Sequence, residues 1–149
     1  PEMMADIAQQ AAVVARRMGH EPRVALISYA NFGNPDLPRA VPVRDAVEVL
    51  DGRGVGFEYE GEMTVEVALN PEVRANYPFC RLTGPANVLV MPSLHSSQIA
   101  TQLLKELGGG TVLGPMLVGL SKPAQIVPMG TNVSDIVNLA VLAANAADD

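Results

Sequence analysis

Two polar segments of the sequence follow short apolar runs, which is where α/β proteins commonly bind a ligand. The first loop, residues 28–34 (SYANFGN), follows the apolar run 24–27. The second loop, residues 93–98 (SLHSSQ), follows the run 88–91 and opens a predicted helix. Hydroxyl, amide and glycine N–H groups can bind the oxygens of a phosphate or a carbonyl group. An ordinary polar loop explains either segment equally well, so both interpretations stay open at this point.

The glycine-rich segments do not have the order that a nucleotide site needs. The run GRGVG at 52–56 follows a predicted helix and precedes a predicted strand, whereas a dinucleotide fingerprint lies between a strand and a helix. We therefore expect a helix end and a turn there. The run GGG at 108–110 is not followed by Gly-Lys-Ser/Thr and is therefore not a P-loop.

Metal and nucleophile chemistry have little support in the sequence. The histidines His20 and His95 are isolated, without a second ligand four residues away, so no metal site is predicted. Ser28 lacks the Gly-x-Ser-x-Gly context of a hydrolase nucleophile. Three glutamates occupy alternate positions of one predicted strand, and because carboxylates in a row repel one another we expect a solvent-exposed face. They are Glu58, Glu60 and Glu62.

The remaining sequence predicts the elements that position these segments. Helical periodicity appears four times, at residues 7–18, 42–50, 94–107 and 133–144. The apolar stripe of the first helix is Ile7, Ala11, Val14 and Met18, and that of the third is Ile99, Leu103, Leu104 and Leu107, which we expect to face inward. The second helix is expected to end at Gly52, and the fourth to be capped by Asn132. The continuous apolar runs 24–27 and 88–91 predict buried central strands, and the alternating run 57–60 predicts an edge strand. Short strands are also expected within 112–118 and at 126–127.

Together these elements predict an α/β fold, a three-layer sandwich with a mainly parallel sheet. The 149 residues suit one domain, with a possible crossing between subregions near residues 119–130. The net charge of −6 disfavours nucleic acid as a partner, and no apolar run approaches the ~18 residues of a membrane span. The single cysteine, Cys80, fits a reducing compartment, so we expect a cytoplasmic protein. The start, PEMM, suggests a piece of a longer polypeptide.

The motifs, taken together and in order, resemble the phosphate acetyltransferase (phosphotransacetylase) family. The segments that carry the resemblance are RVALISY at 23–29, EGEM at 60–63, ANVLVMP at 86–92, GPMLVGLSKP at 114–123 and DIVN at 135–138. They extend over nearly the whole chain but correspond only to the C-terminal part of such an enzyme. The resemblance therefore implies the C-terminal part of a phosphotransacetylase-like fold.

Departures from the family pattern indicate which branch the chain is closest to. The family typically has Ser-Thr-Lys-Gly in the first loop, where this chain has Ala30-Asn31-Phe32-Gly33 without the lysine. After Lys122-Pro123 the family typically continues Val-Asn-Asp-Leu-Ser-Arg-Gly, where this chain has Ile126 and Met129 at the acidic and basic positions. Acyl transfer from CoA needs a group that manages the thiol proton and cations that hold phosphate. Apolar side chains can do neither, so no catalytic residue is predicted.

The sequence more closely resembles the phosphotransacetylase-like C-terminal domain of bacterial NADP-dependent malic enzymes. The segments YANFG at 29–33, GEM at 61–63 and YPFCRL at 77–82 carry this likeness. It implies a regulatory domain that binds acetyl-CoA and inhibits a distant malate-oxidising site. NADP and a divalent metal are then expected in an N-terminal malic-enzyme domain, and no cofactor in this part. The apolar C-terminal helix also suggests a homo-oligomer, since it can bury itself against a partner.

Three functional hypotheses follow: an acetyl-CoA-sensing regulatory domain, an active phosphate acetyltransferase, or a dimerisation module that binds nothing. On the first, we expect acetyl-CoA to lie against the two loops near Lys122, one of only two lysines in an acidic chain. The alternative for Lys122 is that it only faces solvent. The expected binding residues are Ser28, Tyr29, Asn31, Phe32, Gly33, Ser93, His95, Gln98 and Lys122.

Overall fold

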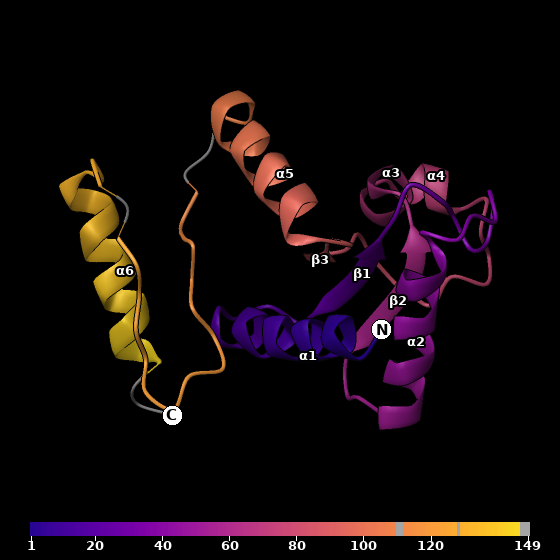
Figure 1. Ribbon diagram of the computed structural model, residues 1–149, viewed down its shortest axis with the longest axis horizontal. Helices are drawn as coiled ribbons and strands as arrows, with labels where there is room; N and C mark the ends of the chain where they lie inside the picture. Colours follow the sequence, from indigo (N-terminus) through magenta and orange to yellow (C-terminus); the bar gives the residue numbers. More distant parts are fainter. Residues whose placement is uncertain (110–111, 128, 147–149) are drawn as a thin grey trace. The chain divides into compact units, whose positions relative to one another are not determined.

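A computed structural model of the chain describes residues 1–109, 112–127 and 129–146 (Figure 1). Gly110 of the glycine run and Pro128 of the motif after Lys122 lie outside the described residues. The chain divides into two compact units, Pro1–Ile99 and Ala100–Asp149, and the boundary falls within helix α5 (Leu94–Leu107). The crossing expected near residues 119–130 lies inside the second unit.

The first unit contains a parallel three-stranded sheet in the order β2-β1-β3. Strand β1 (Arg23–Ile27) is central and its residues 24–26 are fully buried, so the prediction of a buried central strand is confirmed there. Strand β2 (Glu58–Met63) forms one edge, as the alternating run predicts. Strand β3 (Val88–Val90) forms the other edge of the described sheet and buries only Val90, so the prediction of a second central strand is wrong. A short continuous apolar run does not distinguish an edge strand from a central one.

Two helices cover one face of this sheet. Helix α1 (Glu2–Arg17) and helix α2 (Val41–Arg53) pack on the β1 side chains of Val24 and Leu26 and on Val90 of β3. Helix α1 buries its small residues Ala5, Ala8 and Ala12. The predicted stripe is wrong, because its members Ile7 and Met18 are 48% and 41% exposed. Small side chains let the helix lie closer to its neighbours, and hydrophobicity alone does not identify them.

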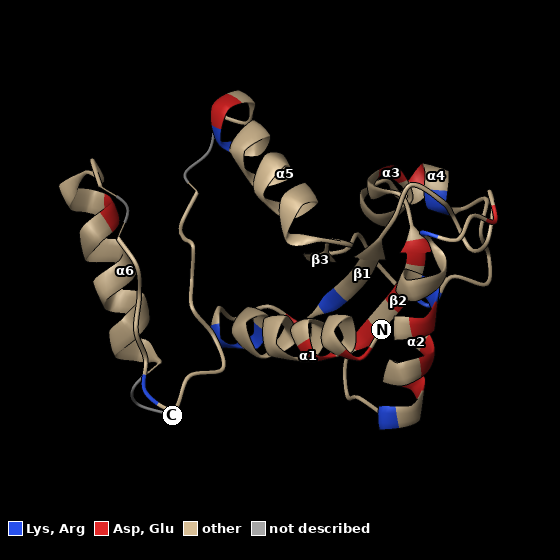
Figure 2. Cartoon of the chain, viewed as in Figure 1, with Lys and Arg blue, Asp and Glu red and all other residues tan. Residues whose placement is uncertain are grey.

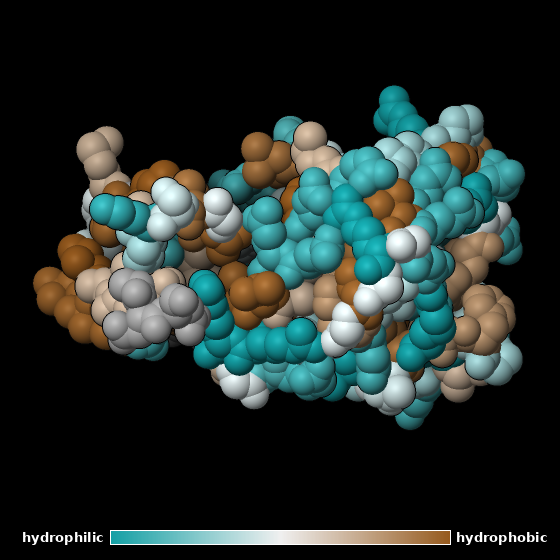
Figure 3. Space-filling view, turned by 90° about the horizontal axis from the view of Figure 1, so that it is seen from below, coloured by the Kyte–Doolittle hydropathy of each residue, from teal (hydrophilic) through white to brown (hydrophobic). Residues whose placement is uncertain are grey.

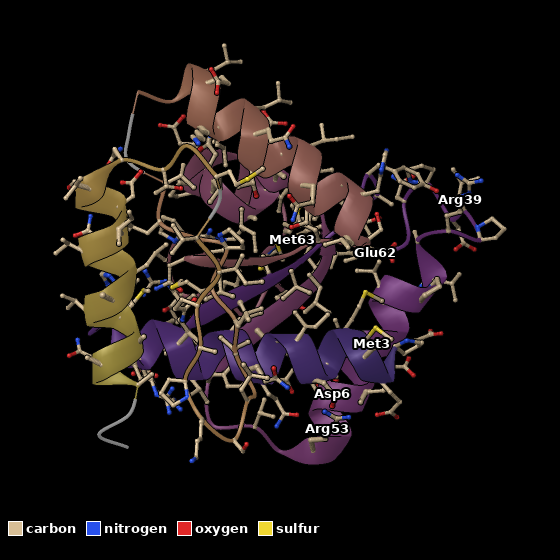
Figure 4. The ribbon with its side chains drawn as sticks, turned by 60° about the vertical axis from the view of Figure 1, so that its left-hand side comes forward. Met3, Asp6, Arg39, Arg53, Glu62 and Met63 are labelled. Atoms are coloured by element: carbon tan, nitrogen blue, oxygen red, sulfur yellow. The ribbon has the colours of Figure 1, made fainter. Side chains whose placement is uncertain are left out.

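The predicted apolar stripe of α2 is confirmed, since its buried residues are Val43, Ala46, Val47 and Leu50. The helix ends after Arg53 rather than at Gly52, because Gly54 adopts the left-handed conformation of a C-cap with φ 59°. Arg53 joins α2 to α1 through an ion pair with Glu2 (2.6 Å). It makes a second ion pair with Asp6 (2.7 Å), which lies near it in Figure 4.

The opposite face of the sheet is covered by the segment that follows β2. Helices α3 (Val65–Leu69) and α4 (Pro71–Arg74) lie beyond the carboxyl end of β2 in Figure 1. The second buried cluster joins this segment to the sheet and contains Ala25, Ile27, Met63, Val67, Ala68, Leu82 and Ala86. The first unit therefore has three layers with a parallel sheet in the middle, as predicted.

The second unit has less regular structure than the sequence predicts. Helix α6 (Val133–Asn145) begins as expected, with Asn132 Oδ1 accepting the Asp135 N–H at 2.8 Å. The short strands expected within 112–118 and at 126–127 do not form, and the described residues there make one isolated antiparallel bridge, Met116 to Gln125. Gly114-Pro115 interrupts the apolar run, and proline has no N–H to donate to a strand ladder. In the described part of the chain, no helix is long and apolar enough to cross a membrane.

Candidate functional site

The first loop leaves the carboxyl end of β1 and is fastened to the residues at the end of β2. The Ser28 N–H donates to the carbonyl oxygen of Met63 at 2.8 Å. The Asn31 side-chain oxygen accepts the Thr64 N–H at 2.8 Å. The Tyr29 side chain lies between these attachments and is 52% exposed. Asn31 is therefore engaged inside the protein, while Tyr29 is open to a ligand.

Phe32 and Gly33 form a left-handed turn that Glu62 holds from both its backbone and its side chain. The φ angles of Phe32 and Gly33 are 52° and 86°. The Phe32 N–H donates to the Glu62 carbonyl oxygen at 2.8 Å, and the Gly33 N–H donates to Glu62 Oε1 at 3.0 Å. The turn thus depends on one side chain from a strand that is 29 residues away in sequence.

The three glutamates of β2 are not an exposed acidic face, which corrects the expectation from the sequence. Glu62 is fully buried, Glu60 is 5% exposed and Glu58 is partly buried. Glu60 accepts hydrogen bonds from the Arg81 backbone N–H (3.1 Å) and Nε (3.0 Å). Glu58 accepts the Thr83 N–H (2.9 Å) and hydroxyl (2.8 Å). Glu58 and Glu60 each have several donors, which offsets the cost of burying their charge, whereas the Glu62 side chain accepts one hydrogen bond, from the Gly33 N–H.

Arg81 also links this strand to α2. Its guanidinium donates to Asp51 at 2.6 Å and lies 4.7 Å from the centre of the Tyr59 ring, while the Tyr59 hydroxyl donates to Asp51 at 2.5 Å. These two donors lower the pKa of Asp51. Burial, together with the Asp51 carboxylate, raises the pKa of Tyr59. The arrangement is a structural network, because Arg81 and Tyr59 both donate to Asp51 and Arg81 also donates to Glu60.

An aromatic cluster lies beside the Phe32 turn. The Phe32 ring centre is 5.1 Å from that of Tyr77 and 4.9 Å from that of Phe79, and the Phe79 side chain is 62% exposed. The neighbouring thiol of Cys80 is partly buried, and this burial raises its pKa. A thiol with a raised pKa stays protonated and is a poor nucleophile. The cluster therefore offers an apolar surface and no reactive group.

The second loop begins at the carboxyl end of β3, which pairs with β1 in parallel, so both loops leave the same edge of the sheet. Ser93 caps α5, since its hydroxyl oxygen accepts the Ser96 N–H at 3.2 Å. The predicted binding residues His95 and Gln98 are exposed on the first turns of α5. Lys122 is exposed and belongs to the second unit, in the segment of the sequence that joins α5 to α6.

The structure adds residues that the sequence did not indicate. The first loop is contacted by Glu62, Thr64 and Arg44. No motif in the sequence around these residues indicates that they contact this loop. The described residues contain no group of three or more His, Cys, Asp or Glu that could hold a metal ion.

Residues 1–144 match the family described as phosphate acetyl/butaryl transferase. The chain belongs to this family. Its parallel sheet and covering helices agree with two solved members, a phosphotransacetylase from Streptococcus pyogenes (TM-score 0.91, 32% identity) and the EutD phosphotransacetylase from Staphylococcus aureus (TM-score 0.89, 30% identity). The chain is covered to 97% in both comparisons, against 44% and 45% of the solved chains. The predicted family and the phosphotransacetylase-like fold are confirmed.

Among the curated relatives of this family member are malic enzymes and phosphate acetyltransferases. The chain is 57% identical over 143 residues to the NADP-dependent malic enzyme of Rhizobium meliloti, and 38% identical over 143 residues to the phosphate acetyltransferase of Paracoccus denitrificans. It spans 19% of the length of the malic enzyme and 45% of the length of the acetyltransferase. The likeness to the malic enzyme covers 96% of this chain, so nearly the whole chain is similar to one segment of that enzyme.

Three positions of this family member carry apolar side chains where the sequence resemblance leads one to expect Lys, Asp and Arg. Phe32 packs in the aromatic cluster, and Ile126 and Met129 are exposed. None of them can take up a thiol proton or bind a phosphate oxygen, because none has a titratable or hydrogen-bonding side-chain group. Within the described residues, the first loop therefore offers hydroxyl, amide and backbone groups for binding rather than a charged group for catalysis.

Proposed function

We propose that this domain binds acetyl-CoA as an allosteric inhibitor within an NADP-dependent malic enzyme and does not itself transfer acetyl groups. The observation that carries the proposal is the set of apolar residues Phe32, Ile126 and Met129 in a chain 57% identical to a malic enzyme. The malate-oxidising centre, with its NADP and divalent metal, then belongs to an N-terminal malic-enzyme domain, in the cytoplasm. Malate oxidation and acetyl-CoA binding are coupled through two distinct sites.

The proposed acetyl-CoA site comprises the first loop and the second loop, both in the first unit, and Lys122 of the second unit is proposed separately as a phosphate contact. Three features support it. Both loops start at the carboxyl ends of neighbouring parallel strands, where ligands of open α/β sheets bind. The second loop opens α5, a helix of 14 residues whose first N–H groups favour a phosphate or carbonyl oxygen. Lys122 is an exposed cation in a chain of net charge −6 and suits a phosphate contact.

The test is acetyl-CoA binding and inhibition in the full-length protein with Lys122→Ala. We expect acetyl-CoA affinity to fall by roughly 1–3 kcal/mol, because a charge-assisted hydrogen bond is lost. Inhibition by acetyl-CoA should weaken while malate turnover without acetyl-CoA stays unchanged. The matched control is Lys105→Ala, which removes the other lysine, exposed on α5, and should leave both quantities as in the wild type. Unchanged binding in Lys122→Ala excludes Lys122 as a phosphate contact.

Asn31→Ala examines the first loop in the same assay. We expect a similar loss of roughly 1–3 kcal/mol in acetyl-CoA affinity. Because Asn31 also accepts the Thr64 N–H, this variant tests the shape of the loop as well as a direct contact. Retained acetyl-CoA affinity in both Asn31→Ala and Lys122→Ala would contradict the proposed site.

The second hypothesis, an active phosphate acetyltransferase, has a direct test of its own. Acetyl phosphate formation from acetyl-CoA and inorganic phosphate is measured in a coupled assay. We expect no turnover above a blank, because the apolar residues supply neither a proton acceptor nor a phosphate-binding cation. Turnover well above the blank by the wild-type protein refutes the regulatory proposal in its non-catalytic form.

A third function, formation of a homo-oligomer, is favoured by one observation. Helix α5 has no buried residue although it is rich in leucine, and α6 buries only Leu139 although it is rich in valine, leucine and isoleucine. Exposed apolar helix faces of this kind are typical of interfaces between subunits. Sedimentation equilibrium measures the assembly, and calorimetry with acetyl-CoA separates a module that only assembles from one that also binds a ligand.

A further inference from the structure

The turn in the first loop is held by a carboxylate that has no contact with water. Glu62 lies at the end of β2 beside Met63 (Figure 4) and is 0% exposed. Its Oε1 accepts the Gly33 N–H at 3.0 Å, while its Oε2 has no hydrogen-bond partner and is buried. A buried carboxylate oxygen without a partner costs stability. Burying Glu62 therefore lowers the stability of the fold. The hydrogen bond that its Oε1 accepts comes from the first loop.

Gly33 is confined by a charged neighbour on its open side. A Cβ atom at Gly33 would lie 2.7 Å from Nη1 of Arg44, so a side chain there displaces the guanidinium. Arg44 is fixed by Asp36, whose Oδ1 is 3.0 Å from its Nη2, and it also attracts Glu62 electrostatically. The Gly33 turn therefore lies between a carboxylate that accepts its N–H and a guanidinium that occupies the space of a side chain.

Phe32 depends on the same attachment. Its φ of 52° is a left-handed conformation that is unfavourable for a residue with a side chain. The carbonyl oxygen of Glu62 accepts the Phe32 N–H at 2.8 Å and so stabilises this conformation. The turn directs Phe32 into its ring contacts with Tyr77 and Phe79. One residue of β2 thus sets the backbone of both positions at the tip of the loop.

From this geometry we infer that Glu62 is a positioning residue for acetyl-CoA binding: its Oε1 holds the Phe32–Gly33 turn in the conformation that receives the ligand. The inference rests on the proposed function, since it assigns Glu62 to the loop where acetyl-CoA is proposed to bind. Glu62 does not touch the ligand, because it is fully buried. It acts through the Gly33 N–H and the Phe32 backbone.

The test compares Glu62→Ala with Glu62→Gln in the full-length protein, by calorimetry with acetyl-CoA. The amide oxygen of Gln can still accept the Gly33 N–H, whereas Ala has no acceptor. We expect acetyl-CoA affinity to fall at least about tenfold in Glu62→Ala and to stay within about threefold of the wild type in Glu62→Gln. Both variants remove one negative charge, which alone strengthens binding of an anionic ligand. A loss restricted to Glu62→Ala therefore reports the hydrogen bond and not the charge.

A general loss of stability is separated by a second buried glutamate of the same strand. Glu60→Ala removes hydrogen bonds to Arg81 and Gly61 and leaves the first loop untouched. We expect it to lower the unfolding midpoint without changing acetyl-CoA affinity. If Glu60→Ala weakens binding as much as Glu62→Ala does, the effect is one of stability and the inference is overturned.

A second pair of variants perturbs the turn from its other side, in case Glu62→Ala does not fold. Gly33→Ala places a methyl group against Arg44, whereas Gly19→Ala has the same left-handed backbone (φ 86° and 81°) and nothing within 4 Å. Both carry the conformational cost of a side chain at positive φ. Because Nη1 is the far end of a flexible side chain, the methyl group displaces Arg44 at little cost, and we expect Gly33→Ala to weaken acetyl-CoA binding by about twofold to threefold and Gly19→Ala to leave it unchanged. Equal affinity in the two variants overturns the inference.

Hydrogen exchange at the Gly33 amide distinguishes a failure of this inference from a failure of the proposed function. We expect the amide to be protected in the wild type and in Glu62→Gln and to exchange faster in Glu62→Ala. If the wild type binds no acetyl-CoA, the proposed function is wrong, and exchange at Gly33 still decides whether Glu62 holds the turn. If acetyl-CoA binds and Glu62→Gln loses as much affinity as Glu62→Ala, Glu62 does not act through its Oε1 acceptor.

Discussion

The two compact units differ in what their apolar side chains contact. In residues 1–99, they fill two clusters, one on each face of the parallel sheet. In residues 100–149, the helix α6 buries Leu139, while Val133, Val137 and Val141 are 77%, 54% and 53% exposed. Figure 3 shows hydrophobic surface at the left of the view, where α6 lies. The difference teaches that amphipathic periodicity identifies a helix without saying what covers its apolar face.

The distribution of charge follows the same division. Helix α2 carries charged residues along its length (Figure 2), and its acidic residues Glu48 and Asp51 are exposed. The 13 residues of α6 contain a single charged residue, Asp135, in the first turn. A helix with an exposed face that is almost uncharged is suited to contact with another protein surface. The first unit therefore has the features of a self-sufficient core, whereas α6 in the second unit has a largely apolar and exposed surface.

The largest expected difference between the units is the cost of removing a leucine. Leu26, in the central strand, is 0% exposed, whereas Leu107, at the end of α5, is 81% exposed. We expect Leu26→Ala to lower the free energy of unfolding by about 2–5 kcal/mol, because it leaves a cavity in the core. Leu107→Ala should change it by less than about 0.5 kcal/mol. Urea unfolding followed by circular dichroism measures both, and similar losses would contradict the distinction between the units.

A second prediction concerns the close approach of β2 to β1 in the first unit. A Cβ atom at Gly61 would lie 2.8 Å from both the Cβ and the carbonyl oxygen of Leu26, so β2 has no room for a side chain there. We expect Gly61→Ala to destabilise the protein by about 1–3 kcal/mol. The control is Gly56→Ala, where nothing lies within 4 Å and φ is not positive. If the melting temperature falls equally in the two variants, the close approach is not what matters.

The parts of the fold that follow from local pattern were predictable. The stripe of α2, the cap of α6 at Asn132 and the central position of β1 depend on neighbouring residues or on a continuous apolar run. The edge position of β3 and the alanine face of α1 were not predictable, because they depend on which element packs against them. Long-range packing overrides local hydrophobicity in both cases.

The candidate site divides in the same way. The two loops were found because polar residues follow apolar strands, a pattern that is local. Glu62 was assigned to an exposed face because its sequence neighbours are acidic at alternate positions. Both buried glutamates accept hydrogen bonds from residues distant in sequence. Glu62 accepts the Gly33 N–H, and Glu60 accepts from Arg81. Sequence spacing shows which charges could share a face but not which donors will neutralise them.

A smaller effect compares helix caps in the two units. The Asn132 side chain accepts the Asp135 N–H at 2.8 Å at the start of α6, whereas the Thr64 hydroxyl accepts the Val67 N–H at 3.5 Å at the start of α3. We expect Asn132→Ala to cost about 1 kcal/mol, and Thr64→Ala less, because a longer hydrogen bond is weaker. Amide exchange in the first turns of α6 and α3 measures each loss locally. A greater loss in α3 reverses the comparison.

The smallest effect is a dependence of stability on pH that belongs to the first unit. Hydrogen bonds from Tyr59 and Arg81 lower the pKa of Asp51 in the folded protein. A lowered folded pKa means that the contribution of Asp51 is present above its unfolded pKa and is lost as the pH falls through the folded value, below about pH 4. Because the Asp51 side chain is 48% exposed, we expect its pH-dependent contribution to the free energy of unfolding to be less than about 1 kcal/mol. Asp51→Asn should thus destabilise the protein slightly at pH 7, and its difference from the wild type should shrink as the pH falls below about 4, as measured by urea unfolding between pH 7 and pH 2. Asp45→Asn, which removes a carboxylate from the same helix away from Tyr59 and Arg81, is the control. If the difference between Asp51→Asn and the wild type persists unchanged at pH 2–3, hydrogen bonding to the ionised carboxylate is not its source.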